Sequence, residues 1–195
     1  MNEIIAAVIG GFLAAGAGWF LQWRLEASRL ERLKHLLVIG ITDDLKLSID
    51  LYSRLIDEWD KSQTVWFTTL NELRGSRQTY LNNRDWLVLI NDEPVRQKVL
   101  RYYHRSADHI NLLENQQNRK YNIQAKLHEI SRDILLRNSK LTLEKAQQQA
   151  IRAMHAEDQE LVGLNSLIPQ NIQKVRDFKQ EANELLAKFV TYKNS

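Results

Sequence analysis

Cysteine is absent from the 195-residue chain. Without a thiol the protein forms no disulfide and has no thiolate to serve as a nucleophile or metal ligand. The absence agrees with a body on the cytoplasmic side of a membrane, where thiols stay reduced. The sequence also lacks a metalloprotease histidine motif and a phosphate-binding glycine loop, and its five histidines show no ligand-like spacing. We therefore predict no enzyme, no metal site and no cofactor.

Proline and glycine are scarce, and this scarcity predicts an all-α fold. The chain has two prolines and seven glycines, and four of these glycines fall between residues 4 and 23. Residues 24–195 are rich in Leu, Gln, Arg, Lys and Glu, a composition typical of long helices. We predict a helical bundle or stalk there, with helix breaks near residues 40, 75, 94, 140 and 165.

Residues 4–23 form the one long hydrophobic run, IIAAVIGGFLAAGAGWFLQW. They carry no charge and a single amide, that of Gln22. A helix of this length spans ~30 Å, the thickness of the hydrocarbon core of a bilayer. Glycine is poor in soluble helices but common in membranes, where it lets backbones approach closely. The sequence thus predicts one N-terminal transmembrane helix at 4–23, followed by a cytoplasmic helical domain at 24–195.

Charges beside the apolar segment predict its orientation. The segment is followed by four basic residues, Arg24, Arg29, Arg32 and Lys34. Because Lys and Arg in short flanks stay on the cytoplasmic side, the larger domain is expected in the cytoplasm. A secretory signal peptide carries its positive charge before the apolar run and a small-residue cleavage site after it, and neither is found. We predict a retained anchor in the inner (cytoplasmic) membrane with the N-terminus outside.

Small residues gather on one side of the predicted membrane helix, and bulky residues cover the other. The small side and its one polar residue form the expected pore or oligomer interface: Ala7, Gly10, Gly11, Ala14, Ala15, Gly18 and Gln22. Lipid gains little from a groove of small residues, whereas a second helix packs closely against one. We expect a homo-oligomer, which is either a ring of helices around a pore, with Gln22 at a constriction, or an ordinary helix pair that never conducts.

The net charge of +3 conceals a segregation along the chain. Residues 41–95 hold six basic and ten acidic residues, whereas residues 96–152 hold twelve basic and five acidic ones. Aromatic residues are interleaved with the basic ones, a pattern that suits phosphate and base contacts. The candidate anion-binding residues are Arg96, Arg101, Tyr103, Arg105, Arg119 and Lys120. The ligand would be a nucleotide, an oligonucleotide or an anionic lipid. The alternative is neutralisation by the acidic stretch, across helices or across subunits.

This layout, a glycine-rich span before a basic helical body, resembles the small single-span membrane effectors of bacterial anti-phage systems, in particular Hailong-type channel effectors. In that family a nucleotidyltransferase partner makes a nucleic-acid-like signal that controls an oligomeric channel. The resemblance implies an ion-conducting pore gated by the helical domain through a nucleotide or oligonucleotide ligand, with a possible soluble regulatory partner. It rests on layout alone and assigns no residue.

Two alternatives remain open. One is a non-conducting membrane tether, scaffold or stalk that recruits a soluble partner, although a stalk needs a nearly continuous helix and the predicted breaks disfavour one. The other is a periplasmic coiled coil of the phage-spanin kind, which requires the opposite orientation and is disfavoured by the basic residues after the span.

Overall fold

The computed structural model describes the backbone of residues 2–193 and the side chains of residues 15–190. The elements are α1 (Asn2–Ser62), α2 (Phe67–Gly75), α3 (Gln78–Asn82), the short 3-10 helix η1 (Arg84–Leu89), α4 (Glu93–Arg137), α5 (Leu143–Ala153) and α6 (His155–Lys193). No strand occurs between residues 2 and 193. The predicted all-α fold is confirmed.

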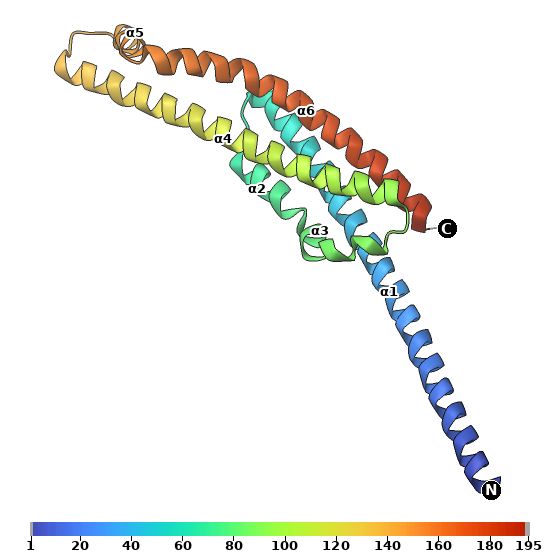
Figure 1. Ribbon diagram of the computed structural model, residues 1–195. Coiled ribbons are helices and arrows are strands. Elements are labelled where there is room, and N and C mark those ends of the chain that lie inside the picture. Colours follow the sequence, from blue (N-terminus) through green and yellow to red (C-terminus); the bar gives the residue numbers. More distant parts are fainter. Residues whose placement is uncertain (1, 194–195) are drawn as a thin grey trace.

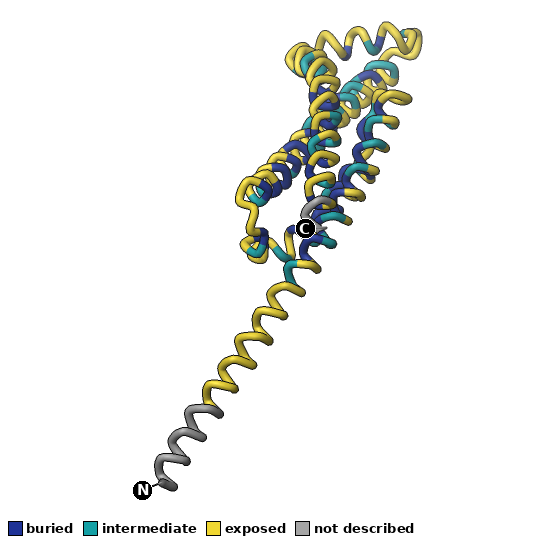
Figure 2. The backbone as a smooth tube through the Cα atoms, turned by 90° about the vertical axis from the view of Figure 1, so that its right-hand side faces the viewer, coloured by how far each residue is buried: buried dark blue, intermediate teal, exposed yellow. Residues whose placement is uncertain are grey.

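The body is built from three long helices that lie side by side. α6 packs against both α1 and α4, and α5 covers the far ends of α4 and α6 (Figure 1). The segment from α2 to η1 wraps around α1 and α4 near the point where α1 leaves the body. The N-terminal part of α1 projects from the body as a single rod, and residues 15–32 are exposed throughout (Figure 2).

α1 runs through Gly40 without interruption, so the helix break predicted near residue 40 is wrong. Leu37, Ile41 and Leu45 are buried one turn apart, and this apolar stripe crosses the glycine directly. A glycine inside a helix costs about 1 kcal/mol relative to alanine. Burying one leucine or isoleucine contributes about 1.5–3 kcal/mol, which exceeds that cost. Tertiary packing therefore overrides the local break signal.

α6 likewise continues through Pro169, and the break predicted near residue 165 does not occur. A proline inside a helix costs about 3 kcal/mol because one hydrogen bond is lost and the ring crowds the preceding turn. Ile168 and Ile172, on either side of it, are buried in the core, and their burial offsets much of this cost. The breaks predicted near residues 75, 94 and 140 do occur, and the described helices are also separated at residues 63–66, 83 and 154, which were not predicted.

Two helix starts follow directly from side-chain capping. The Asp92 carboxylate accepts a hydrogen bond from the Val95 backbone N–H at 3.0 Å, and Pro94 occupies the first turn of α4. The Thr142 hydroxyl caps α5 in the same way, at 3.4 Å from the backbone nitrogen of Lys145. Both caps satisfy a backbone N–H that has no partner inside its helix.

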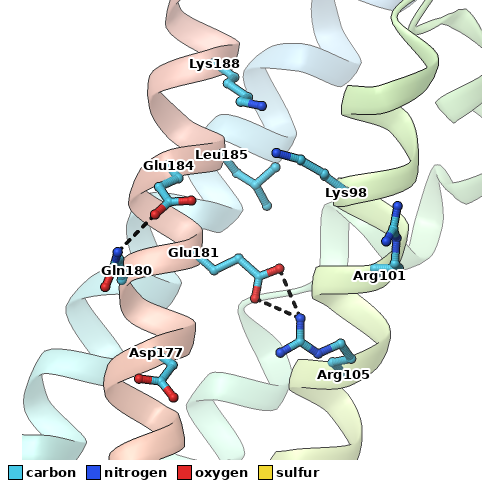
Figure 3. Close-up of a pocket in the computed structure, with 9 residues that line it drawn as sticks. All are labelled: Lys98, Arg101, Arg105, Asp177, Gln180, Glu181, Glu184, Leu185 and Lys188. Atoms are coloured by element: carbon cyan, nitrogen blue, oxygen red, sulfur yellow. Dashed lines mark hydrogen bonds and ion pairs between the residues drawn. The ribbon is translucent and has the colours of Figure 1, made fainter.

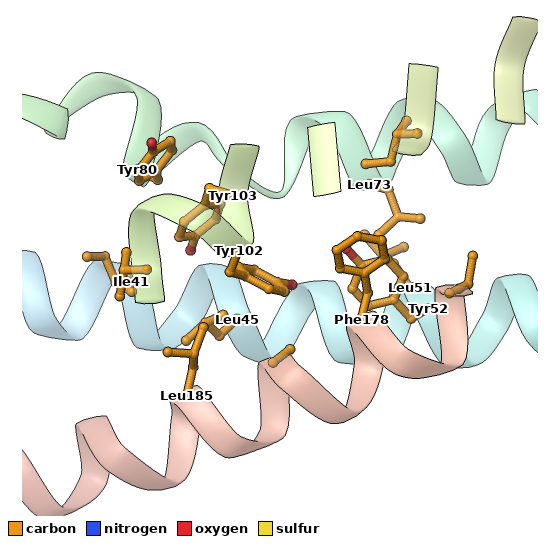
Figure 4. Packing of buried hydrophobic residues seen from close by; sticks show 14 of the residues in the cluster. Ile41, Leu45, Leu51, Tyr52, Leu73, Tyr80, Tyr102, Tyr103, Phe178 and Leu185 are labelled. Atoms are coloured by element: carbon orange, nitrogen blue, oxygen red, sulfur yellow. The ribbon is translucent and has the colours of Figure 1, made fainter. Parts of the chain in front are cut away.

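The hydrophobic core lies where α1, α4 and α6 meet. Aromatic rings fill its centre, with Tyr52 stacked on Phe178 at 6.4 Å and Tyr102 meeting the same ring edge-on (Figure 4). The Tyr52 hydroxyl is hydrogen-bonded to Ser106 at 2.7 Å, so this buried polar group has a partner. A smaller cluster, formed by Ile123, Met154 and Leu164, holds the far end of the body together.

Gly40 is required by a close helix contact, and its substitution tests that contact. A Cβ at this position would lie 2.3 Å from Cγ2 of Thr79, so Gly40→Ala creates overpacking. We expect a net loss of up to roughly 2 kcal/mol of unfolding free energy, because an overpacking cost of about 1–3 kcal/mol is offset by a gain of about 1 kcal/mol in helix propensity. Denaturant unfolding of the full chain, followed by circular dichroism, measures this loss.

Two matched variants distinguish the clash from a general effect of alanine. A Cβ at Gly163 of α6 meets nothing within 4 Å, so Gly163→Ala should stabilise the protein by about 0.5–1 kcal/mol. The double variant Gly40→Ala/Thr79→Ser removes the clashing methyl group and should recover most of the loss. A Gly40→Ala variant as stable as wild type would contradict the proposed contact.

Candidate functional site

Two of the candidate anion-binding arginines are paired with acidic residues of α6. Nη1 of Arg105 lies 3.3 Å from Oε2 of Glu181, and Arg119 makes two 2.7 Å hydrogen bonds to Glu160 (Figure 3 shows the first pair). Each is an exposed pair worth about 0–1 kcal/mol. Neutralisation across helices therefore applies to these arginines, although their partners come from α6 and not from residues 41–95.

Arg96 has a structural contact. Its Nη1 donates to the backbone carbonyl of Ile90 at 2.8 Å and ties the chain before α4 to the first turn of that helix. Lys120 lies half-buried on α4, beside Arg119 in the chain and far from Arg96 along the helix. The six candidates are therefore not brought together into one site.

A groove of about 450 Å³ separates α4 and α6 (Figure 3). Its basic residues are Lys98, Arg101, Arg105 and Lys188, and its acidic residues are Asp177, Glu181 and Glu184. The ammonium groups of Lys98 and Lys188 point toward one another, and this contact lowers the pKa of Lys188. Because three carboxylates face four cations, the groove as a whole is nearly neutral and offers little attraction to a highly charged anion.

A second hollow, of about 400 Å³, lies between α4 and the chain from Arg77 to Arg84. Its charged lining consists of three arginines, Arg77, Arg84 and Arg101, with His104, and no acidic residue lines it. We call this hollow the arginine pocket. It contains Arg101 from the predicted set and two arginines that the sequence analysis did not select.

The candidate Tyr103 also lines the arginine pocket, but its ring is not available to stack on a ligand base. The side chain is 1% exposed, and its ring stacks on that of Tyr80 with 4.1 Å between ring centres (Figure 4). Tyr102 covers another part of it edge-on at 5.2 Å. Burial raises the pKa of the Tyr103 hydroxyl well above its ordinary value, so this group remains a neutral phenol.

Arg77 and Arg84 were not among the predicted anion-binding residues because they lie inside the net-acidic stretch 41–95. Averaging over that stretch concealed a local signal, since residues 74–84 hold three arginines and no acidic residue. Counting charge in short windows would have found them. Their proximity to Arg101 could not be inferred, because it depends on how the turn before α3 packs against α4.

The predicted membrane helix is described only in part. Ala7, Gly10, Gly11 and Ala14 lie outside the described side chains. Ala15 and Gly18 are exposed, and a Cβ at Gly18 would meet nothing within 4 Å. Nε2 of Gln22 donates to the carboxylate of Glu26, one turn on, at 3.3 Å.

Within the described residues, no helix combines the length and apolar character needed to span a bilayer. Those residues also contain no cluster of three His, Asp or Glu side chains that could hold a metal ion. Comparisons of the chain with protein-family models, with curated proteins and with solved structures found no match.

His109, at the α4–α6 contact, predicts a pH-dependent stability. Its Nε2 donates to the backbone carbonyl of Asn171 at 2.8 Å, and burial, together with the nearby charge of Lys174, lowers its pKa. The unfolded chain, with a histidine pKa near 6.5, therefore binds this proton more readily than the folded chain. The stability that neutral His109 provides is present above about pH 6.5 and lost as the pH falls below it.

Unfolding free energies measured across this pH range test the assignment. We expect the unfolding free energy of wild type to decrease as the pH falls below about 6.5, and that of His109→Gln to decrease less. His128→Gln, at an exposed position of the same helix, is the matched control and should keep the wild-type profile. Identical profiles for wild type and His109→Gln would refute the role of this residue.

Proposed function

We propose that the protein is an oligomeric membrane effector in which residues 4–23 form a pore and the helical body at 24–195 controls it. The observation that carries the proposal is the continuity of α1. One helix of 61 residues contains the apolar segment and also the buried face at the centre of the body. The proposed localisation is the inner membrane, with the N-terminus outside and the body in the cytoplasm.

The exposed part of α1 supports the membrane assignment. Large apolar side chains line it without cover, among them Trp19 at 72% and Leu25 at 70% exposure. Contiguous apolar surface of this kind is unusual on a soluble monomer and indicates a surface that lipid or other protein covers. Tryptophans at the end of the apolar run suit the interface between lipid and water.

Control of the pore follows from the same helix. Because α1 has no hinge at Gly40, a change in the tilt or rotation of the body is transmitted to residues 4–23. A ligand changes the pore only if it binds one arrangement of the body better than another. In the proposed anti-phage role this ligand is a nucleotide or oligonucleotide, and a soluble partner protein regulates its supply.

A non-conducting tether or stalk is the second candidate. The continuity of α1 also favours this function. A helix break near residue 40 would disfavour a stalk, and α1 has no such break. A tether needs the apolar segment only as an anchor, whereas a pore needs its small face to contact other copies. Substitutions on opposite faces of the segment therefore separate the two functions.

Gly18→Leu and Gly16→Leu are a matched pair for this test. The two glycines lie about 160° apart around the helix, and Gly18 belongs to the small face. A Cβ at either position meets nothing within 4 Å, so the monomer gains the same leucine in the same open space. We expect induction of wild type and of Gly16→Leu to depolarise bacteria, as reported by a voltage-sensitive dye, and Gly18→Leu to abolish the effect.

Further variants complete the test. Leucine at Gly10 or Gly11 should act as Gly18→Leu does, with the protein still expressed, and deletion of residues 1–23 should also remove the depolarisation. A steady membrane potential for well-expressed wild type with every candidate ligand would favour the tether. Equal depolarisation by the two glycine variants would rule out the small face as the pore interface.

A further inference from the structure

We infer that the arginine pocket binds the phosphate groups of a soluble anion about the size of a nucleotide. This deepens the proposed function, because it gives the regulatory ligand a site. The binding itself does not depend on whether the protein forms a pore.

The arginines of this pocket take part in none of the ion pairs found among the described residues. In the described part of the chain the arginines that form ion pairs are Arg54, Arg74, Arg105, Arg119 and Arg176. Arg77, Arg84 and Arg101 are not among them. His104, at the edge of the pocket, lies 3.6 Å from Asp108, and Arg101 also lines the α4–α6 groove, so Arg77 and Arg84 supply charge that no lining carboxylate balances.

Arg77 is the group that points most directly to a missing anion. Its side chain is 8% exposed, and its Nε is buried with no hydrogen-bond partner. Burial lowers the pKa of this guanidinium, yet arginine remains protonated at any physiological pH. Native proteins rarely leave a buried cation and its N–H donor without a partner, and an anion in the pocket would satisfy both requirements.

The chemistry of the pocket favours phosphate over other anions. Guanidiniums present several N–H donors in a plane and bind phosphate oxygens in pairs, which a single ammonium group cannot do. Three guanidiniums from two segments can surround one group of oxygens from different sides. The volume of about 400 Å³ lies within the usual range for small-molecule sites, roughly 300–1,000 Å³.

The position of the pocket argues for a soluble ligand and against a lipid headgroup. Thr79, in the wall segment, packs against Gly40 of α1, and 17 residues separate Gly40 from Trp23 at the end of the apolar run. At ~1.5 Å per residue, the point where the wall segment contacts α1 is about 25 Å from that end along the helix. The polar headgroup layer is only about 5–8 Å thick on each side of the hydrocarbon core.

The pocket wall is attached to α1 (Figure 1), so occupancy can influence the helix that carries the apolar segment. The Tyr80 backbone N–H donates to the Asp44 carboxylate of α1 at 3.0 Å, and Thr79 contacts Gly40. An anion held between Arg77 and Arg101 would link this wall to α4. It would thereby stabilise the arrangement of α1 and α4 in which the three arginines line one hollow.

Thermal unfolding of the full-length protein with ATP or pyrophosphate, against sodium chloride at equal ionic strength, tests the inference. We expect both phosphate compounds to raise the unfolding temperature in a saturable manner. Arg101→Gln removes an exposed pocket arginine and should weaken the apparent affinity about tenfold, the loss of one charge-assisted hydrogen bond. Arg77→Met should do the same.

Arg105→Gln is the matched control, because it removes the same charge from the same helix one turn away, where the arginine is already paired with Glu181. It should leave the affinity for ATP and pyrophosphate unchanged. Equal losses for Arg101→Gln and Arg105→Gln, or no saturable shift with either compound, would overturn the inference. Binding to vesicles containing phosphatidylglycerol, with none to ATP or pyrophosphate, would overturn the assignment to a soluble ligand.

The pocket inference and the pore proposal can be refuted independently of one another. If ATP binds and Arg101→Gln weakens it, while wild type never changes the membrane potential, the pocket stands and the pore proposal fails. If Gly18→Leu abolishes depolarisation but no phosphate compound binds, the pore stands and the pocket inference fails.

Discussion

The rest of the structure depends on α1, one helix with a part packed in the core and a part exposed outside the body. Between residues 37 and 59, α1 presents a buried apolar stripe to α4 and α6, whereas between residues 15 and 32 every residue is exposed. Most of the stability of a helix in a protein comes from tertiary packing, and the packing of the buried part of α1 fixes the direction in which the exposed part leaves the body. Any partner of the exposed segment therefore meets a helix whose orientation is set by the core.

A short polar network fixes the remaining segment against this helix. Asp44 of α1 is buried and accepts the Tyr80 N–H, and burial raises the pKa of its carboxyl group. Ser48 of α1 is hydrogen-bonded at 2.9 Å to Ser76, just before Arg77. Both contacts hold one stretch of chain, which also carries two of the three pocket arginines, Arg77 and Arg84. The close approach at Gly40 belongs to the same arrangement, so the pocket wall and α1 are held as one unit.

Local signals predicted the fold class and the capped helix starts, because an Asp before Glu-Pro acts within four residues. They failed at Gly40 and Pro169, where the sequence alone cannot weigh an unfavourable residue against the burial of Ile41 or Ile168 by a distant helix. The candidate site was predicted least well. Of six proposed ligand residues only Arg101 and Tyr103 line the arginine pocket, since the partner of each cation depends on which helix face lies opposite. A charge count over short windows would have selected Arg77, but neither its burial nor its position in one hollow with Arg101 can be read from such a count.

The proposed anion site would supply energy on the scale that the proposed control of an assembly requires. Converting a two-state population from 1:99 to 99:1 requires about 5.5 kcal/mol of differential binding. A hydrogen bond to a charged group contributes about 1.5–3 kcal/mol, so three guanidiniums that engage an anion in one arrangement and not in the other would supply about 4.5–9 kcal/mol. Small residues occupy one side of the apolar segment and bulky residues the other, so a rotation of α1 replaces small residues by bulky ones at a helix contact. Because α1 is continuous through Gly40, a rotation imposed at the pocket wall reaches Gly18 without a hinge to absorb it.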